Sequence, residues 1–150
     1  MNRTAALVVM IAVVLGSPLC AQEMATDDPA LYAVGALGAS NLYTTYFLLG
    51  TLADGYATAA YTSQFAEELA HDIIGLNEGA IDVLNQLVEE GGLSPDDLAL
   101  VQEMITAHEL LIRQTWGLLA YVEDPTQTDD WFQFRREAWA LIRDLLDMDS

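Results

Sequence analysis

Residues 29–53 read PALYAVGALGASNLYTTYFLLGTLA and contain no charged side chain. An aspartate bounds the stretch on each side, and the chain that follows carries charges at helical spacing. Asp28-Pro29 is typical of a helix start, because a carboxylate accepts from free backbone N–H groups and proline has no N–H to leave unpaired. Gly55 favours a helix end. We therefore expect a first helix over about residues 29–54, with the other helices packed around it.

The first predicted helix is also long enough to cross a membrane, which needs about 20 consecutive apolar residues. Its polar content argues against a span, because it includes Asn41, three threonines, three glycines and three tyrosines. We therefore expect a helix of a bundle and no membrane span in the processed protein. The alternative is a membrane-spanning first helix that precedes a set of soluble helices.

Three further helices are predicted from apolar residues that recur every three or four positions. We place them over about residues 56–90, 95–122 and 128–146. The clearest start is Ser94-Pro95, where a serine caps the helix and a proline fills its first turn. Four long helices joined by short loops predict an all-α, antiparallel up-down-up-down four-helix bundle over residues 29–150.

Each of these three helices has one apolar line, which we expect to face the core. In the helix over residues 56–90 the line is Phe65, Leu69, Ile73, Leu76, Ala80, Val83 and Leu87. In the next helix it is Leu98, Val101, Ile105, His108, Ile112, Thr115, Leu119 and Val122. In the last helix it is Trp131, Ala138, Ile142 and Leu145, with Arg135 among them.

Residues 1–21 have the pattern of a secretory signal peptide. Arg3 is the only charge before an apolar segment, and Ala21 offers a small residue at which cleavage is expected. Residues 22–28 would then form a mobile tail. We expect an exported protein, periplasmic or secreted, that keeps no cysteine and therefore no disulfide. The alternatives are an uncleaved anchor and attachment of a lipid at Cys20.

The charge of the chain is strongly one-sided. It has 23 acidic and 5 basic side chains, none of them lysine, for a net charge of −18. A surface of this sign repels nucleic acid and anionic membranes, so we exclude both as partners. It attracts cations and basic proteins, which are candidate partners. The alternative is that the charge serves solubility in a salty medium, where screening weakens the repulsion.

The two histidines, His71 and His108, differ in setting. Glu68 and His71 have the spacing of one half of a carboxylate-bridged di-iron site, but the chain has no second copy of that pair. His108 lies in the middle of an apolar line and needs a hydrogen-bond partner when buried. Covalent haem would need a C-x-x-C-H motif, which is missing, and Met104 lies one turn away on the same helix, where it cannot bind the opposite face of a haem. We therefore predict no cofactor and no metal site.

Arg135 lies on the predicted core line of the last helix and therefore needs a partner. Counting about 1.5 Å per residue through the turns places several polar residues at its height. They are Asn41, Thr45, Glu68, Asp72 and Thr115. We expect a polar layer across the bundle, in which Glu68 or Asp72 pairs with Arg135. The alternatives are an arginine whose charged end reaches solvent and a ligand pocket at this level.

Function is less determined by the sequence than fold. No catalytic motif is present, so we expect an exported, acidic, non-enzymatic helical-bundle protein with a structural or partner-binding role. A homodimer through the aromatic side of the first helix fits that role; this side comprises Tyr32, Tyr43 and Phe47. The alternative is a periplasmic carrier of a small ligand or cofactor that uses the polar layer. Its candidate ligand-binding residues are His108, Arg135, Asn41, Thr115, Glu68 and Asp72.

Overall fold

The protein is described here by a computed structural model that places residues 29–148, with side chains from residue 31 onward. Every element in this part of the chain is a helix. Helix α2 covers Pro29–Ala57, α3 covers Ser63–Glu90, α4 covers Pro95–Glu123 and α5 covers Asp129–Leu145. The predicted all-α class is therefore confirmed as a helical bundle. The predicted signal peptide over residues 1–21 and tail over residues 22–28 lie outside the described residues.

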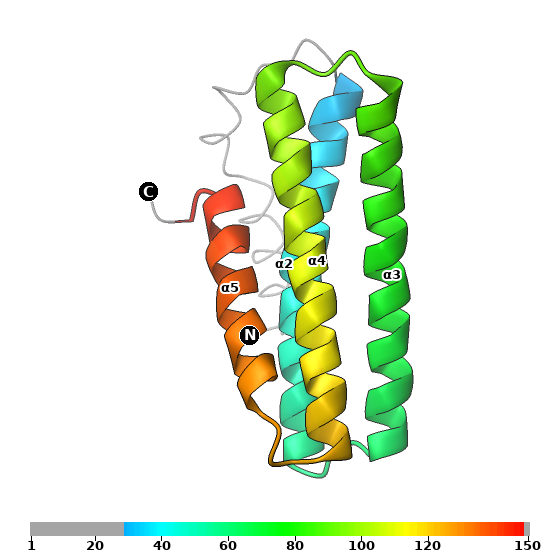
Figure 1. Cartoon of the computed structure of the whole chain (residues 1–150), viewed down its shortest axis with the longest axis vertical. Coiled ribbons are helices and arrows are strands. Elements are labelled where there is room, and N and C mark those ends of the chain that lie inside the picture. The colour runs from blue at the N-terminus through cyan, green and yellow to red at the C-terminus, as the bar shows by residue number, and fades with distance from the viewer. Residues whose placement is uncertain (1–28, 149–150) are drawn as a thin grey trace, which may run out of the picture. The chain divides into compact units, whose positions relative to one another are not determined.

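Consecutive helices run in opposite directions in Figure 1 and are joined by short connections. The described residues from Val34 onward belong to one compact unit, and every contact reported below lies within it. Helix α4 packs against both α3 and α5. The Tyr56 hydroxyl of α2 donates a hydrogen bond to the Val122 carbonyl of α4, at 3.1 Å. Helix α4 therefore contacts each of the other three helices.

Helix α2 is longer than predicted and does not end at Gly55. It continues to Ala57, and residues 58–62 form the connection to α3. Gly55 is needed for a close approach instead, because a Cβ at this position would overlap the ring of Tyr61. The Gly55 carbonyl accepts from the backbone N–H of Ala60, at 2.8 Å, and from that of Tyr61, at 3.0 Å. The glycine lets the chain turn back against the helix end.

The helix starts follow the capping chemistry of the sequence. Ser94 Oγ accepts from the backbone N–H of Asp97, at 3.1 Å, which confirms the predicted start of α4. Helix α3 begins seven residues later than predicted, at Ser63, because Thr62 Oγ1 accepts from the Phe65 N–H, at 3.2 Å. It ends before Gly91 and Gly92, whose φ angles of 75° and 90° are in the region that glycine adopts readily.

The core is aliphatic and draws on all four helices. Its largest fully buried aliphatic side chains are Leu42, Leu49, Leu52, Ile73, Leu111, Leu118 and Ile142. Burying such a side chain contributes about 2 kcal/mol. Among residues 29–148 no helix combines the length and hydropathy of a membrane span. Helix α2 contributes Leu42, Leu49 and Leu52 to this core.

The predicted apolar line of α3 is wrong in rotation, although Ile73 on it is buried. On α3 the side chains of Phe65, Leu76 and Val83 are 45, 72 and 61 % exposed. The buried side of α3 instead comprises Ala66, Ala70, Ile73, Ile74, Asn77 and Leu84. Small alanines allow the backbone to approach its neighbours closely, so the larger side chains lie on the flank. On α4 the predicted line is confirmed for Val101, His108, Thr115 and Val122, which are buried. Met104, Leu111 and Leu118 are buried beside them and widen the core side of this helix.

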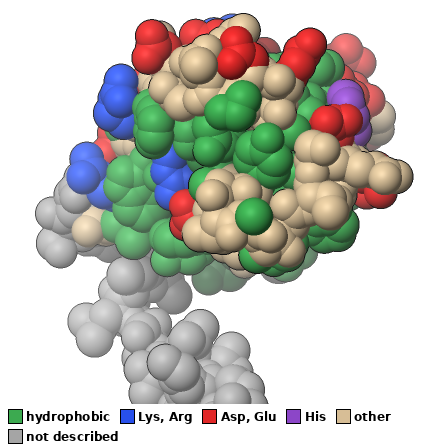
Figure 2. Space-filling view, turned by 90° about the horizontal axis from the view of Figure 1, so that it is seen from below, with side chains coloured by type: hydrophobic (Ala, Val, Ile, Leu, Met, Phe, Trp, Pro, Cys, Tyr) green, Lys and Arg blue, Asp and Glu red, His purple; other side chains and the backbone are tan. Residues whose placement is uncertain are grey.

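Figure 2 looks onto the end of the bundle that carries the α2–α3 and α4–α5 connections. Hydrophobic side chains occupy the middle of this face, and acidic side chains lie mostly around its margin. Tyr61 of the α2–α3 connection, Phe65 in the first turn of α3 and Phe132 in the first turn of α5 are exposed. The acidic charge is therefore spread around an apolar interior that reaches the surface at this end.

Helix α5 begins directly against α4, and a glycine permits the contact. A Cβ at Gly117 would lie 2.6 Å from the backbone nitrogen of Trp131 and 2.9 Å from its Cα. Backbone atoms cannot move aside as the end of a flexible side chain can. The predicted core line of α5 is confirmed for Trp131, Ala138 and Ile142, all of which are buried.

Gly117→Ala is expected to lower the free energy of unfolding by about 2 kcal/mol, because the added methyl group meets the α5 backbone. Gly75→Ala is the matched control, since nothing lies within 4 Å of a Cβ there. That control should raise stability by up to about 1 kcal/mol, because alanine is the better helix former. Urea unfolding followed by circular dichroism measures both. An unchanged midpoint for Gly117→Ala would contradict the close α4–α5 contact.

Candidate functional site

His108 is a buried core residue held by one hydrogen bond. Its side chain is 1 % exposed. Its Nδ1 lies 2.7 Å from Oδ1 of Asn77 on α3. The Asn77 amide nitrogen donates to the Ile73 carbonyl, at 2.7 Å, so its oxygen is the atom left to accept. His108 therefore carries its proton on Nδ1, and Nε2 is an acceptor.

The buried setting keeps His108 neutral at physiological pH. Burial lowers the pKa of its imidazole from 6.5 to about 4, because the charged form loses its hydration. No hydrogen-bond partner of Nε2 is found among the described residues. In a neutral imidazole whose Nδ1 already donates a hydrogen bond, Nε2 remains free to accept one from a donor group of a ligand.

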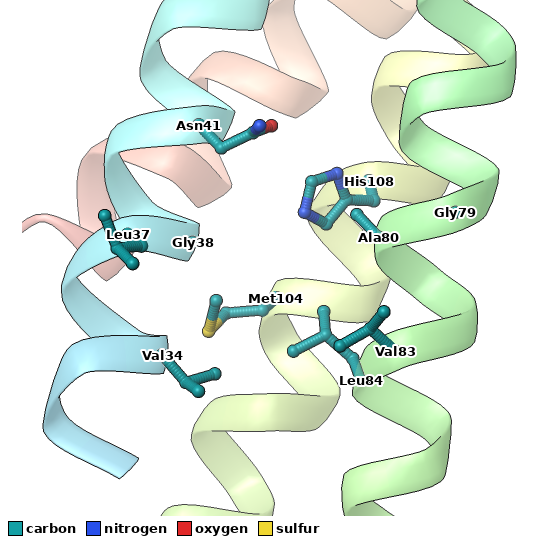
Figure 3. Close-up of a pocket in the computed structure, with 10 residues that line it drawn as sticks. All are labelled: Val34, Leu37, Gly38, Asn41, Gly79, Ala80, Val83, Leu84, Met104 and His108. Carbon is teal, nitrogen blue, oxygen red and sulfur yellow. The ribbon is translucent and has the colours of Figure 1, made fainter. Parts of the chain in front are cut away.

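A groove beside His108 runs between α2, α3 and α4 (Figure 3). We call it the His108 groove; it is lined by Val34, Leu37, Gly38, Asn41, Gly79, Ala80, Val83, Leu84, Met104 and His108. Its volume is about 380 Å³. The His108 ring points into this space, and the Asn41 side chain extends toward it from the α2 wall. The remaining lining is apolar.

Two lining residues explain the form of the groove. A Cβ at Gly38 would overlap the terminal methyl group of Met104, so the glycine lets the methionine reach α2. Gly79 on the α3 wall has nothing within 4 Å of the position of a Cβ. Met104 therefore closes the groove on the side of Gly38, whereas the space beside Gly79 is open.

Arg135 does not pair with an acid among the described residues. Its Nη1 is buried and has no hydrogen-bond partner there. Its guanidinium carbon lies 4.8 Å from the ring centroid of Tyr46 and 5.5 Å from that of Trp131. A Cβ at Gly50 would lie 2.8 Å from Nη1, so this glycine makes room for the guanidinium. Aromatic rings stabilise the cation in place of a carboxylate.

The predicted ion pair of Arg135 with Glu68 or Asp72 is therefore wrong. Both acids are exposed, and Glu68 accepts from Gln64 on its own helix, at 2.9 Å. The rise of about 1.5 Å per residue places these residues at a similar height, but it does not determine how each helix is rotated about its axis. Because α3 is rotated relative to the prediction, its acids point away from the core.

The other predicted members of the polar layer also separate. Thr115 is buried and donates to the Leu111 carbonyl of its own helix, at 2.7 Å. Asn41 lines the groove with His108, whereas Arg135 lies at Gly50, about 13 Å further along α2. The structure thus brings together His108 and Asn41 and leaves Arg135 in another environment. A ligand-binding role of these residues stays a prediction.

A cluster of aromatic side chains joins α2 to α5. We call Tyr43, Phe47 and Trp139, with Tyr46 beneath them, the aromatic surface. The Tyr43 and Phe47 rings are 4.7 Å apart, and the Phe47 and Trp139 rings are 6.0 Å apart. Tyr46 stacks on Trp139 at 5.0 Å. Tyr43 and Phe47 are 38 and 45 % exposed, so the aromatic side predicted for the first helix reaches the surface.

Two buried polar residues were missed by sequence reasoning. Asn77 does not belong to the predicted apolar line of its helix, although it lies one turn after Ile73, which does. Gln114 is fully buried, and neither atom of its amide has a hydrogen-bond partner among the described residues. The signal available in the sequence was its position one turn after Leu110 and Leu111 on the apolar side of α4.

Metal-binding groups do not gather within residues 29–148. No three His, Cys, Asp or Glu side chains there are close enough to hold an ion. His71 is exposed and lies 5.8 Å from the ring of Trp116. The pair of Glu68 and His71 therefore finds no third ligand in this part of the chain.

Comparisons with protein-family models, with curated proteins and with solved structures find no match to this chain. The His108 groove and the aromatic surface are two features of the described residues that a partner or ligand could use, and they share no residue.

The buried state of His108 predicts a specific dependence of stability on pH. Its folded pKa of about 4 lies below the usual 6.5, so the unfolded chain binds the proton first as the pH falls. Stability from this group is complete above about pH 6.5 and is lost between pH 6.5 and 4. The loss at pH 4 is about 3 kcal/mol.

The pH effect is measured as the difference between the wild type and His108→Asn, because the carboxylates titrate in both. Urea unfolding at several pH values should show the wild type losing stability more steeply below pH 6.5. Parallel curves, or a His108 titration midpoint near 6.5 by NMR, would contradict the buried neutral imidazole.

Arg135→Met tests whether the guanidinium is held by rings alone. The change removes a buried donor that has no partner among residues 29–148 and keeps an apolar side chain of similar length. We expect the free energy of unfolding to change by less than about 1 kcal/mol, since a cation–π contact contributes about that much. A loss above about 3 kcal/mol in the same urea assay would instead indicate a buried ion pair.

Proposed function

We propose that this is an exported, non-enzymatic protein that associates with a second copy of itself through the aromatic surface. The observation that carries the proposal is a cluster of aromatic side chains, Tyr43 and Phe47 exposed among them, beside the stretch of α2 from Val34 to Ala53 that carries no charge. In this proposal the four antiparallel helices form a rigid support, and residues 1–21 direct export and are removed. Export is supported by the pattern of those residues alone.

The distribution of charge favours a second copy as the partner. From Val34 to Ala53 helix α2 carries no acidic or basic residue, although the chain has 23 acids. Two copies that met through α3 would bring like charges together, and this would oppose association. Two copies that met through α2 would keep their acids apart. The exposed side of α2 is therefore the surface on which self-association meets least repulsion.

The composition and rigidity of the aromatic surface also favour association. Phe, Tyr and Trp are enriched at protein interfaces, because each buries a large area with few rotatable bonds. Here the buried Tyr46 stacks on Trp139, and the Arg135 guanidinium lies 4.8 Å from the Tyr46 ring. The rings are held before any partner binds, so association loses little side-chain freedom.

Phe47→Glu and Phe65→Glu form a matched pair, because both phenylalanines are 45 % exposed and lie on different helices. Phe47→Glu should weaken self-association by about 30-fold or more, since it places a charge within the aromatic surface. Phe65→Glu should leave it unchanged. Sedimentation equilibrium over a wide concentration range measures both.

The sample is the full chain expressed in an exporting host, and mass spectrometry of the purified product reports whether residues 1–21 have been removed. Association through an uncharged surface should persist at 1 M salt, whereas binding of a basic protein would weaken. A wild type that stays monomeric near 1 mM, or equal effects of the two variants, would contradict the proposal.

A further inference from the structure

We propose that the His108 groove binds a small neutral molecule with an apolar body and one hydrogen-bond donor, such as an alcohol or a phenol. In the complex the donor group of the ligand donates to His108 Nε2. This site is independent of the aromatic surface, because the two share no residue.

The acceptor is built by a chain of two hydrogen bonds. Asn77 donates to Ile73, which orients its amide, and the amide oxygen accepts from His108 Nδ1. This fixes both the orientation and the tautomer of the imidazole. The ring is 1 % exposed, and its remaining nitrogen has no partner among the described residues. An acceptor that is held in place and left open to the groove is a polar group to which a ligand can donate a hydrogen bond.

The walls of the groove select an apolar body. Its volume of about 380 Å³ is in the range of small-molecule sites. Leu37 and Val83, on opposite walls, are 72 and 61 % exposed, so a ligand between them would bury apolar surface. Asn41 is the other polar side chain of the lining, and its amide can orient a second polar group.

The lining excludes charged ligands. It contains no Asp, Glu, Lys or Arg, so an ion would lose its hydration without gaining a counter-charge. His108 is neutral at pH 7, because burial lowers its pKa to about 4. An anion is further disfavoured by the net charge of −18. A neutral donor is the ligand class that remains.

The test compares 4-ethylphenol with 4-ethylanisole, which has the same body but cannot donate. Binding to the full chain is followed by the imidazole resonances in NMR. The chain has two histidines, so the exposed His71 serves as the internal reference. We expect 4-ethylphenol to shift the His108 resonances saturably and to bind about tenfold more tightly than 4-ethylanisole. The His71 resonances should stay in place.

Two variants separate the walls of the groove from the acceptor. Gly79→Leu fills the groove from a position with open space around its Cβ, and it should abolish binding. Gly75→Leu, one turn earlier on α3 and equally unobstructed, does not line the groove and should bind as the wild type does. His108→Asn keeps a donor near Asn77 but has nothing at the position of Nε2. It should reduce the preference for the phenol to about twofold or less.

The outcomes are distinct. The proposal is overturned if 4-ethylphenol does not shift His108 at millimolar concentration, or if Gly79→Leu binds as well as Gly75→Leu. It is also overturned if the wild type binds both probes equally, because Nε2 would then not accept from the ligand. Circular dichroism checks that each variant is folded, and Gly79→Leu keeps the test decisive if His108→Asn does not fold.

Discussion

The hydrogen bond between Asn77 and His108 joins α3 to α4 inside the core and determines what the site can do. It is 2.7 Å long and connects two side chains that are almost completely buried. An imidazole buried without this bond would be costly, so the bond favours one rotation and register of the two helices. It also fixes the proton on Nδ1. The same interaction therefore stabilises the bundle and leaves Nε2 facing the groove.

A second constraint is the separation of charge along the chain. Helix α2 carries the buried leucines Leu42, Leu49 and Leu52 and no charge between Val34 and Ala53, and its one acid, Asp54, lies close to its C-terminal end. The side chains of this stretch carry no charge, so they can be buried in the core or exposed at the surface without electrostatic repulsion from the acids of the protein. This explains how one helix contributes to the core, to the His108 groove and to the aromatic surface.

Over residues 29–148 the sequence predicted the number, type and approximate bounds of the helices, because caps and breakers are local. Ser94 and Gly91 act over one turn and need no tertiary contact. The rotation of α3 could not be predicted, because Ala66 and Ala70 are buried while the larger Leu76 is exposed. The close approach of the α3 backbone to its neighbours determines which side of α3 is buried. The pattern of large apolar residues does not reveal that approach.

The candidate site was predicted only in part, for the same reason. The burial of His108 could be predicted from the apolar line of its own helix. Its hydrogen bond to Asn77 could not, because it depends on how α3 is rotated toward α4. The ion pair of Arg135 failed because the acids of α3 point outward and the rings of Tyr46 and Trp131 lie beside the guanidinium. Contacts between helices depend on rotation, which the spacing of polar residues along each helix does not determine.

The protonation of His108 in the free protein decides most directly whether Nε2 is an open acceptor. A long-range proton–nitrogen NMR spectrum at pH 7 distinguishes the two tautomers and the charged ring. We predict a neutral His108 with its proton on Nδ1 and an unprotonated Nε2, while the exposed His71 serves as the reference. A proton on Nε2, or a charged imidazole at this pH, would contradict the account.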